Sequence, residues 1–154
     1  MAGSSSTDLV TIRKLNTALW QCPKCGHRFV TKNLWHSCGR YSLASHFKGK
    51  PKILRRTFDR FVSLAKECGP VTVYAQKSRI VIQKRVRFAG AMVRSNWLDA
   101  GIWLKRKVKH PKLIRIESYG NLGYGLRFRL QNPEDIDSSL AEFMQEAYRI
   151  ANQH

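Results

Sequence analysis

Four side chains of the types that bind zinc fall within 17 residues near the N-terminus: Cys22, Cys25, His36 and Cys38. The C-x2-C spacing supplies two thiolates from one tight turn, in which Gly26 lets the backbone fold around a metal. The histidine and the third cysteine are placed to return across a short hairpin and complete a tetrahedral set. His46 is an alternative to His36 as the fourth ligand. The sequence therefore predicts a zinc site here.

This zinc is expected to be structural rather than catalytic. A catalytic zinc keeps one position open for water and usually has an acid nearby, yet no Asp or Glu lies between Asp8 and Asp59. A closed site would fold a module too small to have its own core. A redox-active CxxC is the alternative, and it is disfavoured because no βαβ unit precedes the motif.

The charge of the chain favours a polyanionic partner. The 154 residues contain 28 Lys and Arg against 10 Asp and Glu, a formal net charge of +18. Half of the acids follow Asn132, so the C-terminal segment is a poor candidate for contacting phosphates. We therefore expect a binding module that contacts nucleic acid without strong sequence preference, the cations meeting phosphates and the aromatic rings meeting unstacked bases. The expected contact residues are Lys24, Arg28, Lys48, Lys50, Lys52, Arg55, Arg56, Trp97, Trp103, Lys105, Arg127 and Arg129.

Two other function classes remain open. Buried arginines between helix and sheet could grip a small anion bidentately, and the candidate residues for such a pocket are Arg79, Gln83, Arg85 and Arg115. A protein-interaction adaptor is the third class. An enzyme is not expected, because Asp99 and Glu117 are interpreted as ion-pair partners among so many bases, without nuclease spacing. His110 is expected to be solvated in a loop.

The positions of apolar residues predict two helices around a set of strands. Stripes at helical spacing run from Leu54 to Cys68 and from Ile136 to Ala151, the second with Asn132 or Asp135 as N-cap. Six short segments between them read as strands in meander order, the last two joined as a hairpin. In the segment WLDAGIWLK, residues 98, 100, 102 and 104 share one core-like face. The expected fold is α+β: a small N-terminal zinc-knuckle module, then a mainly antiparallel sheet of about six strands whose one face is covered by two helices.

The expected organisation is a disordered N-terminus (1–11), a zinc-binding module (12–47), a basic linker (48–53) and an α+β domain (54–154). No stretch approaches the apolar length of a membrane span, and the N-terminus has no signal-peptide pattern. The chain is therefore expected to be cytoplasmic, with reduced cysteines and no membrane partner. The sequence does not indicate an oligomeric state.

A succession of short blocks also resembles a known family. In order, they are CPKCGH, HSCGR, FKGK, FDRF, ECGPV, KSRI, LDAGIWL, RIES and IDSSL. This order resembles the bacterial family called domain of unknown function 5655, in the form preceded by a zinc knuckle, over nearly everything from Trp20 to Ile150. The resemblance implies metal positions at Cys22, Cys25, His36 and Cys38, and a fold similar to small α+β proteins of YdhG type. It implies no established reaction.

Overall fold

A computed structural model describes residues 20–21, 28–29 and 41–153. The chain divides into two compact units, Met1–His36 and Ser37–His154, which we describe separately. In the first, β1 (Trp20–Gln21) pairs antiparallel with β2 (Arg28–Phe29). The four expected zinc ligands and Lys24 lie outside the described residues. The second unit starts before residue 54, because α1 (Leu43–Phe47) packs Leu43 and Phe47 against the same core as the rest of that unit.

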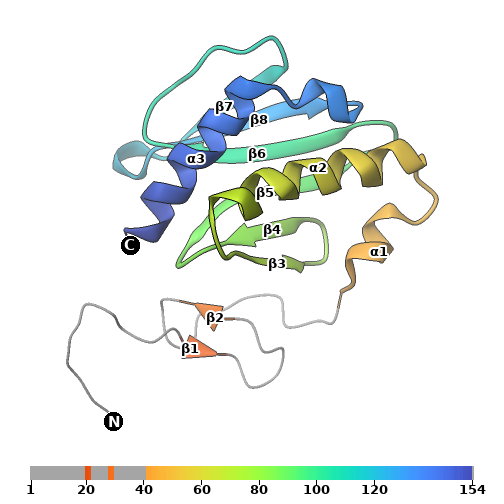
Figure 1. Ribbon diagram of the computed structural model, residues 1–154, viewed down its shortest axis with the longest axis horizontal. Helices are drawn as coiled ribbons and strands as arrows, with labels where there is room; N and C mark the ends of the chain where they lie inside the picture. The colour runs from red at the N-terminus through yellow and green to blue at the C-terminus, as the bar shows by residue number, and fades with distance from the viewer. Residues whose placement is uncertain (1–19, 22–27, 30–40, 154) are drawn as a thin grey trace. The chain divides into compact units, whose positions relative to one another are not determined.

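The second unit is a sheet covered on one face by two helices (Figure 1). The long helices are α2 (Lys52–Cys68) and α3 (Ser138–Asn152). The six strands are β3 (Thr72–Ala75), β4 (Ile80–Gln83), β5 (Arg87–Val93), β6 (Leu98–Leu104), β7 (Leu113–Ser118) and β8 (Tyr124–Leu130). All neighbours pair antiparallel. The predicted α+β class, its six strands and its two long helices are confirmed.

The strand order is β3-β4-β5-β6-β8-β7, so the expectation of a simple meander is wrong at its last step. The hairpin of β7 and β8 is present, but β8 lies beside β6 and β7 forms the edge. The physical reason lies in the side chains. Leu126, Phe128 and Leu130 of β8 are fully buried, whereas Ile114 of β7 is 49% exposed, so the more apolar strand takes the inner place.

The core lies between the sheet and the helices. Leu98, Ala100, Ile102 and Leu104 are buried, as their alternation predicted. They pack with the apolar stripes of both helices, including Phe58, Phe61, Leu140 and Met144. No helix of the described residues is long and apolar enough to span a membrane.

The start of α3 differs from the prediction. Asp137 caps this helix by accepting a hydrogen bond from the Leu140 amide at 3.0 Å. Asp135 instead ends the short 3-10 helix η2 (Pro133–Asp135), and its carboxylate accepts from the Gln131 amide at 2.7 Å and the Asn132 amide at 3.3 Å. Hydrogen bonds from backbone amides to these two carboxylates let the chain turn between β8 and α3 while Ile136 remains buried.

His110 is also placed differently from the expectation of a solvated loop residue. Its side chain is only 3% exposed, packed edge-on against Phe128. The Lys112 amide donates to Nδ1, which leaves Nε2 to donate to Asp137 at 2.9 Å. Burial raises the pKa of the Asp137 carboxyl, but hydrogen bonds from the Leu140 amide and the His110 ring outweigh burial, so the net pKa lies below its usual value. The β6–β7 loop is thereby fixed to the start of α3.

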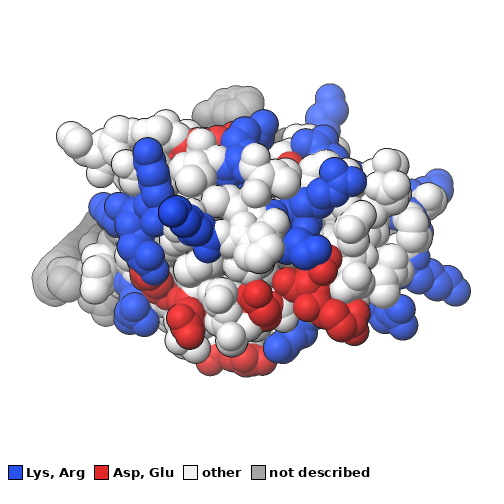
Figure 2. All heavy atoms as spheres, turned by 90° about the horizontal axis from the view of Figure 1, so that it is seen from above, with Lys and Arg blue, Asp and Glu red and all other residues white. Residues whose placement is uncertain are grey.

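Two further ion pairs join this basic loop to the acidic C-terminal segment. Arg106 grips Glu146 at 2.9 Å, and Lys112 lies 3.4 Å from Asp135. Figure 2 shows the acidic side chains in a band across the lower part of the visible face, with Lys and Arg above and beside them. The C-terminal acids therefore neutralise part of the basic surface instead of only avoiding a polyanion.

Candidate ligand-binding site

The face of the sheet opposite the helices has a floor without side chains at its centre. Strand register places Gly90 of β5 directly opposite Gly101 of β6, and Gly101 opposite Arg127 of β8. Val81 of β4 completes this row opposite Gly90. Two adjacent glycines on the outward side leave bare backbone where neighbouring rows carry Met92 and Trp103, so the sheet is hollowed there.

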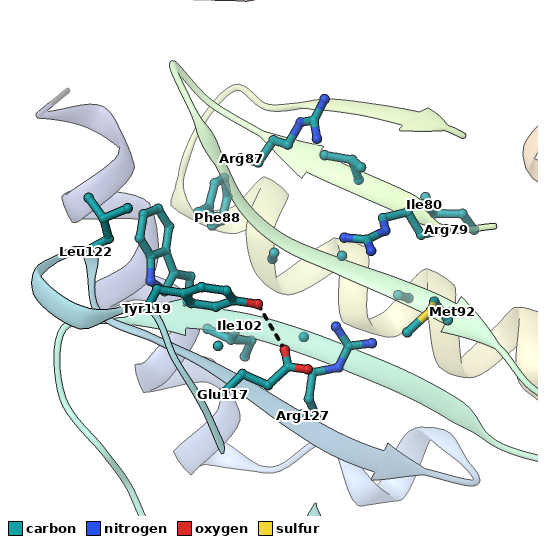
Figure 3. A pocket seen from close by; sticks show the side chains of 17 residues that line it. Arg79, Ile80, Arg87, Phe88, Met92, Ile102, Glu117, Tyr119, Leu122 and Arg127 are labelled. Carbon is teal, nitrogen blue, oxygen red and sulfur yellow. Dashed lines mark hydrogen bonds between the residues drawn. The ribbon is translucent and has the colours of Figure 1, made fainter. Parts of the chain in front are cut away.

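A cavity of about 370 Å³ lies over these glycines, within the size range of small-molecule sites. Figure 3 shows it from the open side, with the helices behind the sheet. Its lining comes from Arg79 and strand β4, from β5, β6 and β8, from Glu117 of β7 and from the turn after β7, and most of the lining side chains are apolar. The charged residues of the lining are Arg79, Arg87, Glu117 and Arg127.

One end of the hollow is cationic. The Arg79 and Arg127 guanidinium groups extend into it from opposite sides (Figure 3). Arg127 is held in place by Asp99, which is 2% exposed and accepts from its Nε at 2.9 Å. Asp99 also accepts from Arg94 at 3.4 Å, so this carboxylate is shared between two cations. Glu117, in turn, pairs with Arg115 at 3.1 Å. The charge that reaches the hollow is therefore positive.

Arg127 also has an unused donor. Its Nη2 is buried and lacks a hydrogen-bond partner among the described residues. A buried charged donor without an acceptor is costly, and most such groups in proteins are paired. The ring nitrogen of Trp103 is likewise buried without a partner, but it lies close beneath Gly123 in the turn that follows β7. Nη2 is therefore enclosed by protein, and the part of the Arg127 guanidinium that faces the glycine floor of the hollow is Nη1, 3.2 Å from a Cβ built at Gly101.

The other end of the hollow is aromatic. Tyr119 packs over the bare backbone of Gly125, where an added Cβ would lie 3.2 Å from its ring, and its hydroxyl donates to Glu117 at 3.2 Å. Tyr119 and Leu122 are 52% and 63% exposed, which is high for large apolar side chains. They sit in a turn that contains η1 (Gly120–Leu122) and closes at Gly123, whose φ of 115° requires glycine. An apolar ring could be covered from this side.

Beside the pocket, a buried polar group supports Arg87. Its Nε donates to the Tyr74 hydroxyl at 3.1 Å, and that hydroxyl donates to Gln83 at 3.2 Å. Tyr74 and Gln83 are 5% and 2% exposed. These two buried hydrogen bonds hold the Arg87 side chain in a fixed position at the edge of the hollow.

The residues predicted for a small-anion pocket do not all meet. Arg79 lines the hollow, Gln83 serves as the buried partner of Tyr74, and Arg115 pairs with Glu117. Arg85 lies in the turn between β4 and β5. The expected location between helix and sheet is also wrong, because that space is filled by the core. Arg87 and Arg127 were missed as pocket residues; the signal that could have shown them is the outward position of Gly90 and Gly101 on neighbouring strands.

The residues predicted for nucleic-acid contact fall into two described groups. Trp103, Arg127 and Arg129 come from the open face, and the Trp97 ring carries the Arg129 guanidinium at 4.7 Å. The second group lies around α1 and the start of α2, where the Arg55 guanidinium lies 5.2 Å from the centre of the Phe47 ring. This second group consists of Lys48, Lys50, Lys52, Arg55 and Arg56. Lys105 follows β6 and is exposed, and Arg28 belongs to β2 of the first unit.

The family model described as "Domain of unknown function (DUF5655)" matches residues 43–151. The chain belongs to this family. The match covers α1 to α3 and therefore the whole hollow. No curated protein and no solved structure matches the chain. In the part of the chain that the structure describes, no three His, Cys, Asp or Glu side chains gather as a metal site would require.

Proposed function

We propose that this DUF5655 domain is a binding module whose open-face hollow takes a small ligand with an anionic group and a planar ring. The observation that carries the proposal is the convergence of Arg79 and Arg127 on one hollow, with the Arg127 Nη1 lying over Gly101 on its floor. An anion there would accept from both guanidinium groups and relieve their mutual repulsion. The exposed Tyr119 and Leu122 would cover the ring.

The test uses 2-naphthyl phosphate as a probe, because it combines one ring system with one phosphate. Arg79→Gln should weaken its binding about tenfold, since a hydrogen bond to a charged group is worth about 1.5 kcal/mol. Arg56→Gln is the matched control, because it removes an exposed arginine on α2. Titration calorimetry with 2-naphthol and inorganic phosphate separates the two halves of the ligand, and both should bind more weakly than the whole. Equal effects of the two arginine changes would contradict the proposal.

The N-terminal module is proposed to be a structural zinc knuckle of a cytoplasmic protein, and the second unit to be a YdhG-like relative. The spacing of Cys22, Cys25, His36 and Cys38 supports the zinc set. Elemental analysis of the full chain should give about one zinc per molecule. Cys22→Ser should remove it, whereas Cys68→Ser, at a partly buried position on α2, should not. Undiminished zinc in Cys22→Ser would refute this ligand set.

A further inference from the structure

The acidic side chains are distributed unevenly between the two sides of the sheet. Apart from Asp99 and Glu117, every acid in the described residues lies on α2, α3 or the segment that leads into α3. The six strands, by contrast, contain no lysine, and six arginines lie on the open face within these strands or next to their ends: Arg79, Arg87, Arg94, Arg115, Arg127 and Arg129. Arginine is the cation that both stacks on planar rings and binds phosphate through two donors.

Three of these arginines lie outside the hollow. Arg94, Arg115 and Arg129 are exposed, the first two with side chains 47% and 58% accessible. Arg129 pairs with Asp99 in the register, two residues along β8 from Arg127, so it stands about 7 Å further along the sheet. A free small ligand held by Arg79 and Arg127 would not reach these outer arginines.

Two of the outer arginines, Arg94 and Arg129, are already held in position without a ligand. Arg129 lies 4.7 Å and Arg94 5.9 Å from the centre of the Trp97 ring, and Arg94 reaches Asp99. Two guanidinium groups held on one indole lose little freedom when they bind a further anion. Trp97 therefore acts by positioning cations, in place of the base stacking that we expected from the sequence.

We propose that the ligand of the hollow is one nucleotide of a single-stranded nucleic acid, whose neighbouring phosphates lie on Arg94 and Arg129. This inference rests on the proposed function and names its ligand. A single strand offers both the planar ring that the recessed hollow needs and the regular line of phosphates that the outer arginines need. A duplex keeps its rings stacked and paired, so it could offer only its phosphates. An acidic peptide would offer charge without a planar ring.

The test measures anisotropy of a labelled strand of about 15 deoxythymidines with the full chain, over a series of salt concentrations. Changing Arg94 and Arg129 together to Gln should weaken binding and lower the salt slope by about 1.4, since each phosphate contact on a single strand contributes about 0.7. Tyr119→Ala should weaken binding about fivefold through lost ring contact. The matched control changes Lys66 and Arg149 to Gln, which removes the same charge from the helix layer.

Each outcome decides between alternatives. Equal affinity for duplex and single strand, equal affinity for thymidine monophosphate and the strand, or equal competition by polyglutamate would overturn the inference. So would a double arginine variant that behaves like the control. The Arg94 and Arg129 changes should leave binding of 2-naphthyl phosphate within about twofold. If that probe does not bind while the strand does, the proposed small-ligand function fails and the outer arginines alone carry binding.

Discussion

Replacing Asp99 with alanine is expected to lower the free energy of unfolding by about 3 kcal/mol, with a fall in melting temperature of roughly 10 °C. Asp99 is 2% exposed, and it holds Arg127, whose side chain is 15% exposed. Removing the carboxylate takes away the acceptor of the Arg127 Nε beside a central strand, and the Nη2 of the same guanidinium already lacks a partner among the described residues. Thermal and urea unfolding of the full chain measure the effect.

Two further variants show whether the stability lost in Asp99→Ala comes from leaving the Arg127 guanidinium buried without its carboxylate. Arg94→Gln removes the exposed partner of the same carboxylate, and it should cost less than about 1 kcal/mol. Asp99→Leu combined with Arg127→Met should recover part of the stability lost in Asp99→Ala, because apolar groups can replace a buried ion pair. An Asp99→Ala protein that unfolds like the original would show that the pair is not required.

Gly90 and Gly101 are paired neighbours in the sheet, yet Gly90→Ala should lower the free energy of unfolding strongly and Gly101→Ala only slightly. A Cβ at Gly90 would lie 2.6 Å from the Ile80 carbonyl oxygen, so backbone must move and stability should fall by about 3 kcal/mol. The three heavy atoms nearest to a Cβ at Gly101 would all belong to the Arg127 side chain, the closest being Nη1 at 3.2 Å, and this side chain can shift. Gly101→Ala should therefore stay within about 1 kcal/mol of the original.

Gly101→Ala should also weaken ligand binding, and this effect tests whether the ligand occupies the hollow. Its methyl group stands on the floor of the hollow and displaces Arg127, so binding of 2-naphthyl phosphate should weaken at least several-fold while the fold persists. Urea unfolding and titration calorimetry measure the two quantities separately. Retained affinity in a stable Gly101→Ala protein would place the ligand elsewhere.

The helices and strands could be predicted because their signals are local. The alternation of Leu98, Ala100, Ile102 and Leu104 defines β6 by itself, and the stripe that includes Phe58 and Phe61 defines α2. The order of β7 and β8 depends on which strand buries more surface against both helices, which is a property of the whole core. The burial of His110 likewise depends on Asp137, 27 residues away.

The pocket was harder to predict than the fold because it depends on register between strands. Arg127 faces Gly101 across a ladder that the sequence does not specify, and Gly90 joins them from a third strand. The sequence indicates Arg79 as an anion-binding residue, but it groups Arg79 with Arg115, whose guanidinium pairs with Glu117 in the structure. A glycine at an outward strand position indicates open space or the close approach of another group to the backbone. Gly90, Gly101 and Gly125 lie on the neighbouring strands β5, β6 and β8, and together they indicate a hollow once the register is known.

The measurement that tests the central claim most directly is a titration of the isotope-labelled full chain with 2-naphthyl phosphate, followed by amide NMR spectra. Gly90, Gly101 and Gly125 amides resonate apart from most others, and an aromatic ring bound over them should shift their signals strongly. We predict that the largest shifts fall on these glycines and on Arg127, with little change at Lys48, Lys50 and Lys52. Shifts concentrated at those lysines, with unchanged glycine signals, would contradict the assignment of the open-face hollow as the binding site.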